Sequence, residues 1–204
     1  MAAKSWKNLC KHKKEGGLGF RKSKEFNYAL LSKIAWMIAS GRNSVCMSLL
    51  RSKNKVRTNW LRQPPSKKTS PIWKAIENAK KYLQPDTCYA VRDGKSISIW
   101  KDPWVPWLED FKPKPKDQAA LSYPMMVDSL INPITNSWKI DLLHLLFEPE
   151  SIKAICKITV PMRPTAKKLI WVKDTIGRFF VKSVYQANQE SSLNPNMGGL
   201  WQRL

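Results

Sequence analysis

The clearest helical pattern in the chain is SKEFNYALLSKIAWMIAS, residues 23–40. Its apolar residues recur at steps of three and four, the spacing of one face of an α-helix. Ser23 is expected to cap this helix, because a serine oxygen accepts hydrogen bonds from first-turn amides, and Glu25 suits the positive end of the helix dipole. Gly41 is expected to end it. We therefore predict a largely buried helix, whose core-facing stripe is Phe26, Leu30, Ile34, Met37 and Ile38.

Helical patterns also occur outside this stretch. Asn43 is expected to cap a helix that runs through Leu50. Ser70-Pro71 is a typical helix start, with serine as the cap and proline at the first helical position. The basic, proline-containing segment 52–69 between them is predicted to be a loop. Further helices are predicted at 138–147, at 150–156 and after the capping residue Ser183.

Two β-hairpins are predicted. The first joins strands 87–92 and 96–101 through Asp93-Gly94, a strong short turn signal because glycine adopts positive φ cheaply. The second joins 168–172 to 178–181 around residues 174–177. The fold class predicted is α+β, mostly α-helical with two short β-hairpins, in an irregular architecture of several units.

Composition supports a division into small units, because the fourteen prolines interrupt regular elements. The predicted parts are a basic helical unit at 1–85, a Trp-rich hairpin at 86–110, a Lys/Pro linker at 111–122, and a small helical plus hairpin unit at 123–204. The abrupt apolar and basic end of the chain is expected to reflect truncation of a longer reading frame.

The positive charge is concentrated in one part of the 204-residue chain. The formal net charge is +21; residues 1–85 hold 20 Lys/Arg against 3 acids, a balance of +17, and residues 86–204 hold 16 against 12, a balance of +4. Such an excess favours a polyanionic partner. Nucleic acid, RNA or DNA bound without sequence preference, is the first expectation. An anionic membrane surface is the second, and a merely soluble basic protein the third.

The candidate phosphate-binding residues are lysines and arginines of the N-terminal half, since neutralised phosphates release counterions. The turn Gly16–Gly19 is expected to let the protein backbone approach the nucleic-acid strand. Trp100, Trp104 and Trp107 suit either base stacking or an aromatic core, and we favour the core. The predicted binding residues are Lys11, Lys13, Lys14, Arg21, Lys22, Lys24, Lys67, Lys68, Lys74, Lys80 and Lys81.

Sites for catalysis and metal binding are not evident. The four cysteines show no C-x-x-C spacing, and Cys10 with His12 supplies only two of the four ligands that a structural zinc needs. Acidic residues are scattered, and no pair of aspartates flanked by apolar strand residues could hold two magnesium ions. We predict no catalytic residue, metal, cofactor or small-molecule substrate.

Targeting signals are weak. Residues 1–20 lack an apolar signal-peptide core, and the chain has no apolar run long enough to span a membrane. Lysine and arginine clusters around residues 11–14 and 21–24 are compatible with nuclear import. We expect a nuclear protein, with a cytoplasmic location as the alternative, and no membrane partner.

Several strings in the chain occur together and in a fixed order. They are Trp6-Lys-Asn-Leu-Cys10, Lys14-Glu-Gly-Gly-Leu-Gly-Phe20, Phe26-Asn-Tyr-Ala-Leu-Leu31, Lys33-Ile-Ala-Trp36, Val91-Arg-Asp-Gly94, Ile97-Ser-Ile-Trp-Lys-Asp-Pro-Trp104, Leu169-Ile-Trp171, Gly177-Arg-Phe179 and Val181-Lys-Ser-Val-Tyr185. In this combination the chain resembles the polyproteins of plant LINE-type, non-LTR retrotransposons, along almost its whole length.

The resemblance implies a position between the polymerase core and the C-terminal zinc-binding region, with residues 1–85 as a thumb-like unit. The paired aspartates of the family's polymerase motif and the cysteines and histidines of its zinc-binding region are not in this sequence. The resemblance therefore implies a non-catalytic segment that binds nucleic acid. The alternatives are a remnant whose apolar faces once docked on the polymerase, and an active polymerase or nuclease.

Overall fold

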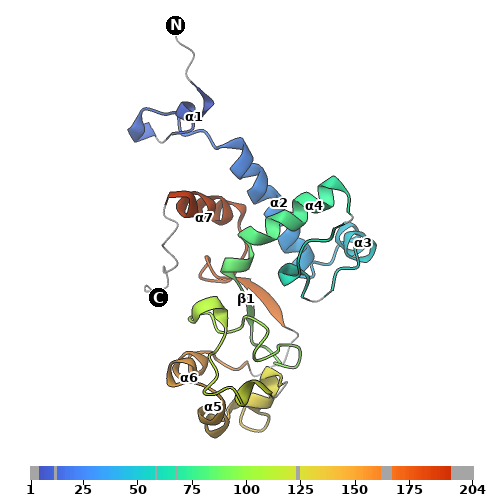
Figure 1. Cartoon of the computed structure of the whole chain (residues 1–204), viewed down its shortest axis with the longest axis vertical. Coiled ribbons are helices and arrows are strands. Elements are labelled where there is room, and N and C mark those ends of the chain that lie inside the picture. Colours follow the sequence, from blue (N-terminus) through green and yellow to red (C-terminus); the bar gives the residue numbers. More distant parts are fainter. Residues whose placement is uncertain are drawn as a thin grey trace. The chain divides into compact units, whose positions relative to one another are not determined.

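The computed structural model describes residues 5–11, 13–57, 59–67, 69–122, 125–161 and 167–193. These residues form two compact units (Figure 1). Unit 1 comprises the described residues up to Gln84 and those from Phe179 onward, and unit 2 comprises Pro85–Arg178. The C-terminal helix thus belongs with the N-terminal helices, although the sequence predicts it as part of the unit at 123–204.

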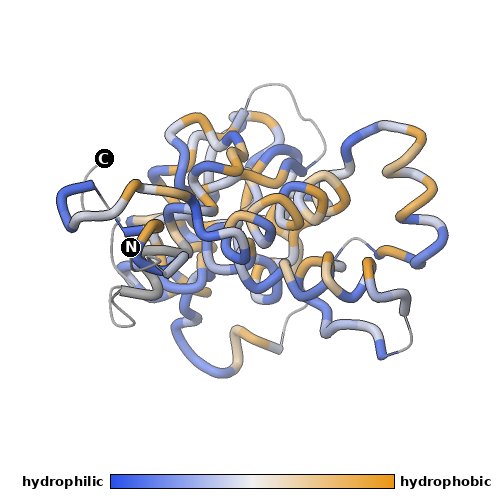
Figure 2. The backbone as a smooth tube through the Cα atoms, turned by 90° about the horizontal axis from the view of Figure 1, so that it is seen from above, coloured by the Kyte–Doolittle hydropathy of each residue, from blue (hydrophilic) through white to orange (hydrophobic). Residues whose placement is uncertain are grey.

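Hydrophobic and hydrophilic residues are interspersed along the backbone (Figure 2), and unit 1 contains only helical regular elements among the described residues. Its elements are α1 (Trp6–Leu9), the 3₁₀ turn η1 (Lys13–Glu15), α2 (Ser23–Ala39), α3 (Val45–Lys53), η2 (Trp60–Arg62), α4 (Pro71–Ala79), η3 (Lys80–Tyr82) and α7 (Val181–Leu193).

Helix α2 forms where the sequence predicts it and packs against α3, α4 and α7. Its end follows the expected chemistry: Gly41 takes φ +70°, its N–H donates to Ile38 O at 3.3 Å, and Arg42 N–H donates to Met37 O at 3.1 Å. This pair of bonds satisfies carbonyls that a helix end leaves without intrahelical donors. The predicted cap Ser23 is wrong, since Ser23 is already helical and Lys22 is the capping residue.

The caps of α3 and α4 decide where those helices start. Ser44, and not the predicted Asn43, accepts a hydrogen bond from Met47 N–H at 3.3 Å. Ser70 caps α4 as predicted, accepting from Trp73 N–H at 3.3 Å, with Pro71 as the first helical residue. Serine precedes the first helical residue in both cases, where its oxygen can reach a first-turn amide.

Helix α7 covers part of α2 and so completes the core of unit 1. Val184 on α7 is fully buried. Tyr185 lies edge-on to Phe26 with ring centroids 6.3 Å apart, and its hydroxyl accepts a hydrogen bond from Lys22 N–H at 3.1 Å. The predicted strand 178–181 is wrong, because α7 begins at Val181 and contains Ser183, which was expected to be its cap.

Unit 2 contains two small antiparallel sheets of two strands each among the described residues, with short helices beside them. The α+β, mostly helical fold class is thereby confirmed. The elements are β1 (Thr87–Ala90), β2 (Ile131–Asn132), β3 (Ser137–Trp138), α5 (Ile140–Leu146), α6 (Pro149–Cys156) and β4 (Lys168–Trp171).

The strands pair differently from the predicted hairpins. Strand β1 pairs with the sequence-distant β4, with Thr87 opposite Trp171 and Ala90 opposite Lys168. The predicted partner 96–101 instead runs beside residues 125–127, where Val127 N–H donates to Ile97 O at 2.9 Å. Residues 174–177 do turn the chain back, but the segment that follows continues into α7. Local turn signals were right about the reversals and wrong about the pairing.

The segment 111–122, predicted as a linker, packs within unit 2. Phe111 is buried and its carbonyl accepts hydrogen bonds from Trp104 N–H at 2.7 Å and Val105 N–H at 2.9 Å. Lys116 N–H donates to Leu146 O at 2.9 Å. A lysine- and proline-rich composition therefore does not prevent this segment from contributing to the core.

Candidate nucleic-acid interface

The described residues 5–11 and 13–22 of unit 1 form a compact basic turn, which we call the N-terminal turn. The chain leaves α1, passes through η1 and returns alongside residues 9–11. Leu9 O accepts hydrogen bonds from Leu18 N–H at 2.9 Å and Phe20 N–H at 3.4 Å, and Lys11 O accepts from Gly19 N–H at 2.9 Å. The backbone is therefore held in place by its own hydrogen bonds.

The glycines make this return possible. Gly16 and Gly19 adopt φ of +76° and +69°, a region that L-residues with side chains rarely populate. At Gly17 an added Cβ would collide with the Lys11 carbonyl group. The glycine motif therefore serves a tight turn in which the backbone approaches itself.

The predicted cations of the N-terminal turn are at the surface. Lys11, Lys13 and Lys14 are exposed, as is Arg21, whose guanidinium lies 5.0 Å from the centroid of the Phe26 ring. Lys22 holds its ammonium 3.4 Å from a Glu25 oxygen, with 45% of its side chain exposed. Lys24 is exposed in the first turn of α2. The structure thus leaves the charges predicted from residues 11–24 at least partly exposed at the surface.

Other predicted cations lie on different elements of unit 1. Lys67 and Lys74 are exposed. Lys81 is also exposed, and its ammonium lies 5.0 Å from the Tyr82 ring centroid and 6.0 Å from that of Tyr28. Lys68 lies outside the described residues. These lysines are spread over the loop before α4, α4 itself and η3.

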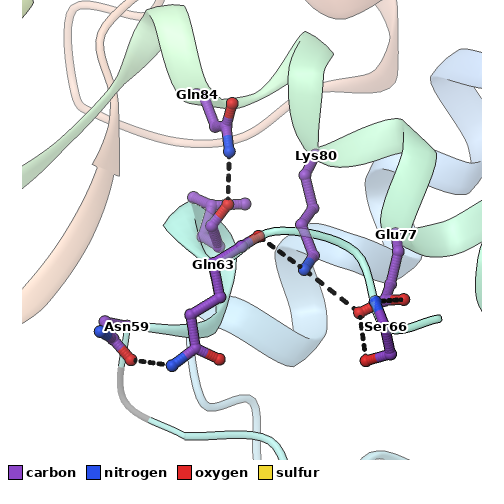
Figure 3. A network of polar contacts seen from close by, with 7 residues as sticks. Asn59, Gln63, Ser66, Glu77, Lys80 and Gln84 are labelled. Atoms are coloured by element: carbon purple, nitrogen blue, oxygen red, sulfur yellow. Dashed lines mark hydrogen bonds and ion pairs between the residues drawn. The ribbon is translucent and has the colours of Figure 1, made fainter.

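Lys80 is a correction to the predicted set, because its side chain is buried and its ammonium points toward Gln63 and Glu77 (Figure 3). Its ammonium lies 3.3 Å from Glu77 Oε1, donates to Gln63 O at 3.4 Å, and sits 4.3 Å from the centroid of the Trp60 ring. Burial lowers the pKa of Lys80, and the Glu77 carboxylate opposes that shift. Lys80 therefore holds the loop before α4 to η3 and is not available to a phosphate.

Sequence reasoning missed an aromatic pair in the N-terminal turn. Trp6 and Phe20 stack with ring centroids 5.9 Å apart and planes 17° from parallel, and the two residues are 54% and 48% exposed. The neighbouring Lys7, also exposed, was not singled out either. The signal was present in the sequence, since each aromatic ring directly precedes a cation, but only the fold places the two rings together.

The tryptophans that were considered for stacking mostly form core. Trp104 is fully buried and donates its indole N–H to Ile99 O at 2.9 Å. Trp100 is half-buried against Phe147, with ring centroids 5.1 Å apart. Trp107 is 42% exposed, with the Lys157 ammonium 5.9 Å from its ring centroid.

In the part of the chain that the structure describes, no three His, Cys, Asp or Glu side chains are grouped closely enough to hold a metal ion. Among the same residues, no helix combines the length and the apolar character required to cross a bilayer.

Half of this chain is similar to plant proteins. It is 34% identical over 105 residues, 49% of its length, to the Arabidopsis thaliana "Putative ribonuclease H protein", of which the match covers 17%. It is 30% identical over 102 residues, 50% of its length, to an A. thaliana "Uncharacterized mitochondrial protein", of which 66% is covered. The chain thus spans less than two thirds of either relative. It matches no protein-family model and no solved structure.

Proposed function

We propose that this chain is a retroelement-derived, non-catalytic protein segment of LINE type, whose unit 1 binds RNA or DNA without sequence preference. The observation that carries the proposal is the clustering of exposed cations in the N-terminal turn. Residues 5–22 contain six Lys/Arg against the single acid Glu15. Such a cluster attracts phosphates and releases their counterions.

The relatives support the retroelement origin of the chain more than they support its binding of nucleic acid. The first relative carries the name of a ribonuclease H protein. That name does not transfer its activity, because the match covers 17% of that protein. The resemblance of the sequence strings to plant LINE-type polyproteins supplies the finer assignment within our proposal.

The test is a salt titration of binding to labelled single-stranded RNA and to duplex DNA with the full chain. The full chain is required because α7, which follows residue 178, packs on α2. We expect log Kd to rise linearly with log salt, with a slope of several units at about 0.9 per neutralised phosphate on duplex DNA. The triple variant Lys13→Glu/Lys14→Glu/Lys22→Glu should bind nucleic acids of all sequences more weakly, and to the same extent.

Two outcomes would reject the proposal. If no binding is detected at about physiological salt, where the Debye length is roughly 8 Å, the basic residues are only solvated surface residues and do not form a nucleic-acid interface. Magnesium-dependent nucleotide incorporation or RNA cleavage by the pure chain would reject its non-catalytic part.

A second candidate function is protein docking, which is favoured by exposed apolar side chains of unit 1. Val45 and Leu49, one turn apart on α3, are 79% and 65% exposed, and Ile72 on α4 is 73% exposed. Val45 and Leu49 are four residues apart and therefore neighbours on one face of α3, and contiguous exposed apolar surface marks places where proteins associate. Chemical cross-linking and light scattering would support this function if the chain self-associates and replacement of Val45 and Leu49 by Ser abolishes the association.

Nuclear localisation is part of the main proposal, since the basic clusters that we assign to phosphates also resemble import signals. A fluorescent fusion of the chain should accumulate in nuclei. Accumulation in another compartment, retained after the clusters are neutralised, would remove this part of the proposal.

A further inference from the structure

We propose that the stacked pair Trp6 and Phe20 is a base-stacking platform, which makes the N-terminal turn a site for single-stranded nucleic acid. This inference rests on the proposed function and narrows its ligand from any polyanion to strands with unpaired bases. Trp6 and Phe20 are each about half exposed, and their planes are 17° from parallel. An aromatic pair of this kind presents a flat π surface to solvent.

The rings are positioned by a folded backbone. Phe20 returns to Trp6 because its N–H and that of Leu18 both donate to Leu9 O, at the end of α1. Gly17 permits the close approach of the returning chain to Lys11. A rigid platform stacks bases without a further loss of side-chain entropy, because both aromatic rings are already ordered.

The charges around the platform indicate what covers it. Lys7 directly follows Trp6 and Arg21 directly follows Phe20, and both are exposed. Lys11, Lys13 and Lys14 lie in the same turn and are exposed too. Aromatic surfaces bordered by cations match a single strand, whose bases stack while its phosphates meet the positive charges. A duplex keeps its bases stacked on each other and offers the platform only phosphates.

A protein partner fits this surface less well. Interfaces between proteins are depleted of lysine at their centre, whereas the turn that carries this platform also carries the exposed Lys7, Lys11, Lys13 and Lys14. A partner would need a matching row of carboxylates in addition to an apolar face. Single-stranded nucleic acid supplies the negative charge and the flat apolar surface in one repeating unit.

The experiment compares two ligands that differ only in their bases. The full chain is titrated with an oligothymidylate of about 12 nucleotides, within the range of single-strand site sizes, and with an abasic oligonucleotide of equal length. We expect the wild type to prefer the oligothymidylate by at least about fivefold, since stacking contributes about 1–3 kcal/mol per base. The variant Trp6→Ala/Phe20→Ala should lose this preference and keep the affinity for the abasic strand and its salt slope.

Three matched variants separate stacking from folding. Trp6→Phe keeps a π surface and should retain most of the preference, whereas Trp6→Leu keeps apolar bulk and should lose it. Trp107→Ala removes an exposed tryptophan of unit 2 and should change nothing. Circular dichroism should show unchanged helix content for all of them, since Trp6 and Phe20 are exposed.

The outcomes distinguish this inference from the proposed function. Equal, salt-dependent affinity for both ligands overturns the platform and leaves phosphate binding in place. Failure to bind either ligand removes the proposed function itself. The platform is also overturned if Trp107→Ala loses the preference for the oligothymidylate. It is overturned as well if Trp6→Ala/Phe20→Ala loses affinity for both ligands equally, or if the only effect of that variant is a loss of self-association.

Discussion

The ammonium of Lys80 lies 3.3 Å from Glu77 Oε1, and the two side chains are only 3% and 1% exposed. Glu77 also accepts hydrogen bonds from Ser66, at 2.9 Å from its N–H and 3.3 Å from its hydroxyl. Beside these contacts, Gln84 donates a hydrogen bond to Leu61 O at 2.7 Å (Figure 3). An ion pair of unit 1 thus holds the loop before α4, in a chain whose net charge suggests that its lysines are at the surface.

Breaking this pair from one side should be costly. Glu77→Gln keeps acceptor and donor atoms but leaves Lys80 as an uncompensated buried charge, so we expect a loss of about 3–5 kcal/mol in the free energy of unfolding. Glu77→Gln/Lys80→Met should recover much of that loss, because no buried charge remains. Urea denaturation followed by fluorescence measures both. If the losses in the free energy of unfolding of Glu77→Gln and of Lys80→Met simply add in the double variant, the two side chains do not stabilise each other.

Stability should also depend on pH through Lys80. Because burial lowers its pKa from 10.5, the unfolded chain binds more protons than the folded chain between the lowered pKa and 10.5. The free energy of unfolding of the wild type should therefore rise relative to that of Lys80→Met as pH increases through this window. Denaturation of both proteins at about pH 7 and about pH 10 tests the sign. A wild type that loses stability relative to Lys80→Met at the higher pH contradicts it.

Adjacent lysines should differ in their effect on nucleic-acid binding. Lys81→Gln removes an exposed charge, so we expect the salt slope for duplex DNA to fall by up to about 0.9 if Lys81 contacts one phosphate. Lys80→Met removes a buried charge and should leave affinity and slope unchanged wherever unit 1 stays folded. Equal effects of the two substitutions in folded protein would show that burial does not decide which lysine binds.

A single methyl group at Gly94 should destabilise unit 2. Gly94 adopts φ +70°, and an added Cβ would lie 2.5 Å from Asp128 N. Gly94→Ala combines an unfavourable backbone conformation with overpacking, which costs about 1–3 kcal/mol. Gly41→Ala is the control, since Gly41 has a similar φ of +70° but open space around its Cα. Thermal unfolding should show the larger loss for Gly94→Ala; equal losses would assign the effect to the backbone alone.

Gly94 also shows what sequence patterns could and could not predict. The signal Asp93-Gly94 was correctly interpreted as a turn, because positive φ is a local property of the chain. The pairing of β1 with β4 joins residues about 80 positions apart, and no local pattern encodes such a partner. Helix α4 was predictable because apolar periodicity and the capping Ser70 lie within the segment itself, and helix α2 was predictable from its periodicity, although its predicted cap Ser23 was wrong.

The candidate site was predictable in part, for the same reason. Charge density identified the lysines of the N-terminal turn, and the structure places them at the surface. The burial of Lys80 depends on Glu77 and on Trp60, which approaches it from η2, 20 positions earlier in the chain. The stacking of Trp6 on Phe20 likewise depends on the return of the chain past Gly17. Contacts that a loop creates cannot be derived from residue spacing.

The packing of α7 on α2 makes unit 1 dependent on the C-terminal part of the chain. Val184 is fully buried in unit 1, whereas Gln186 on the same helix is exposed. Val184→Asp buries an unpaired carboxylate, so we expect a loss of at least about 2 kcal/mol and binding of a hydrophobic dye. Gln186→Asp introduces the same residue at the surface and should behave like the wild type.

The same dependence bears on the binding experiments. A chain cut at residue 110 lacks α7, so it leaves uncovered the face of α2 that carries Phe26, and it removes the Tyr185 hydroxyl that accepts from Lys22 N–H. We expect this fragment to bind the dye and to unfold at a lower urea concentration than unit 1 in the full chain. Weak nucleic-acid binding by the fragment would then result from its unfolding and would not count against the interface. If the fragment instead unfolds at the same urea concentration without dye binding, α7 does not stabilise unit 1, and the first 110 residues are sufficient to measure the interface.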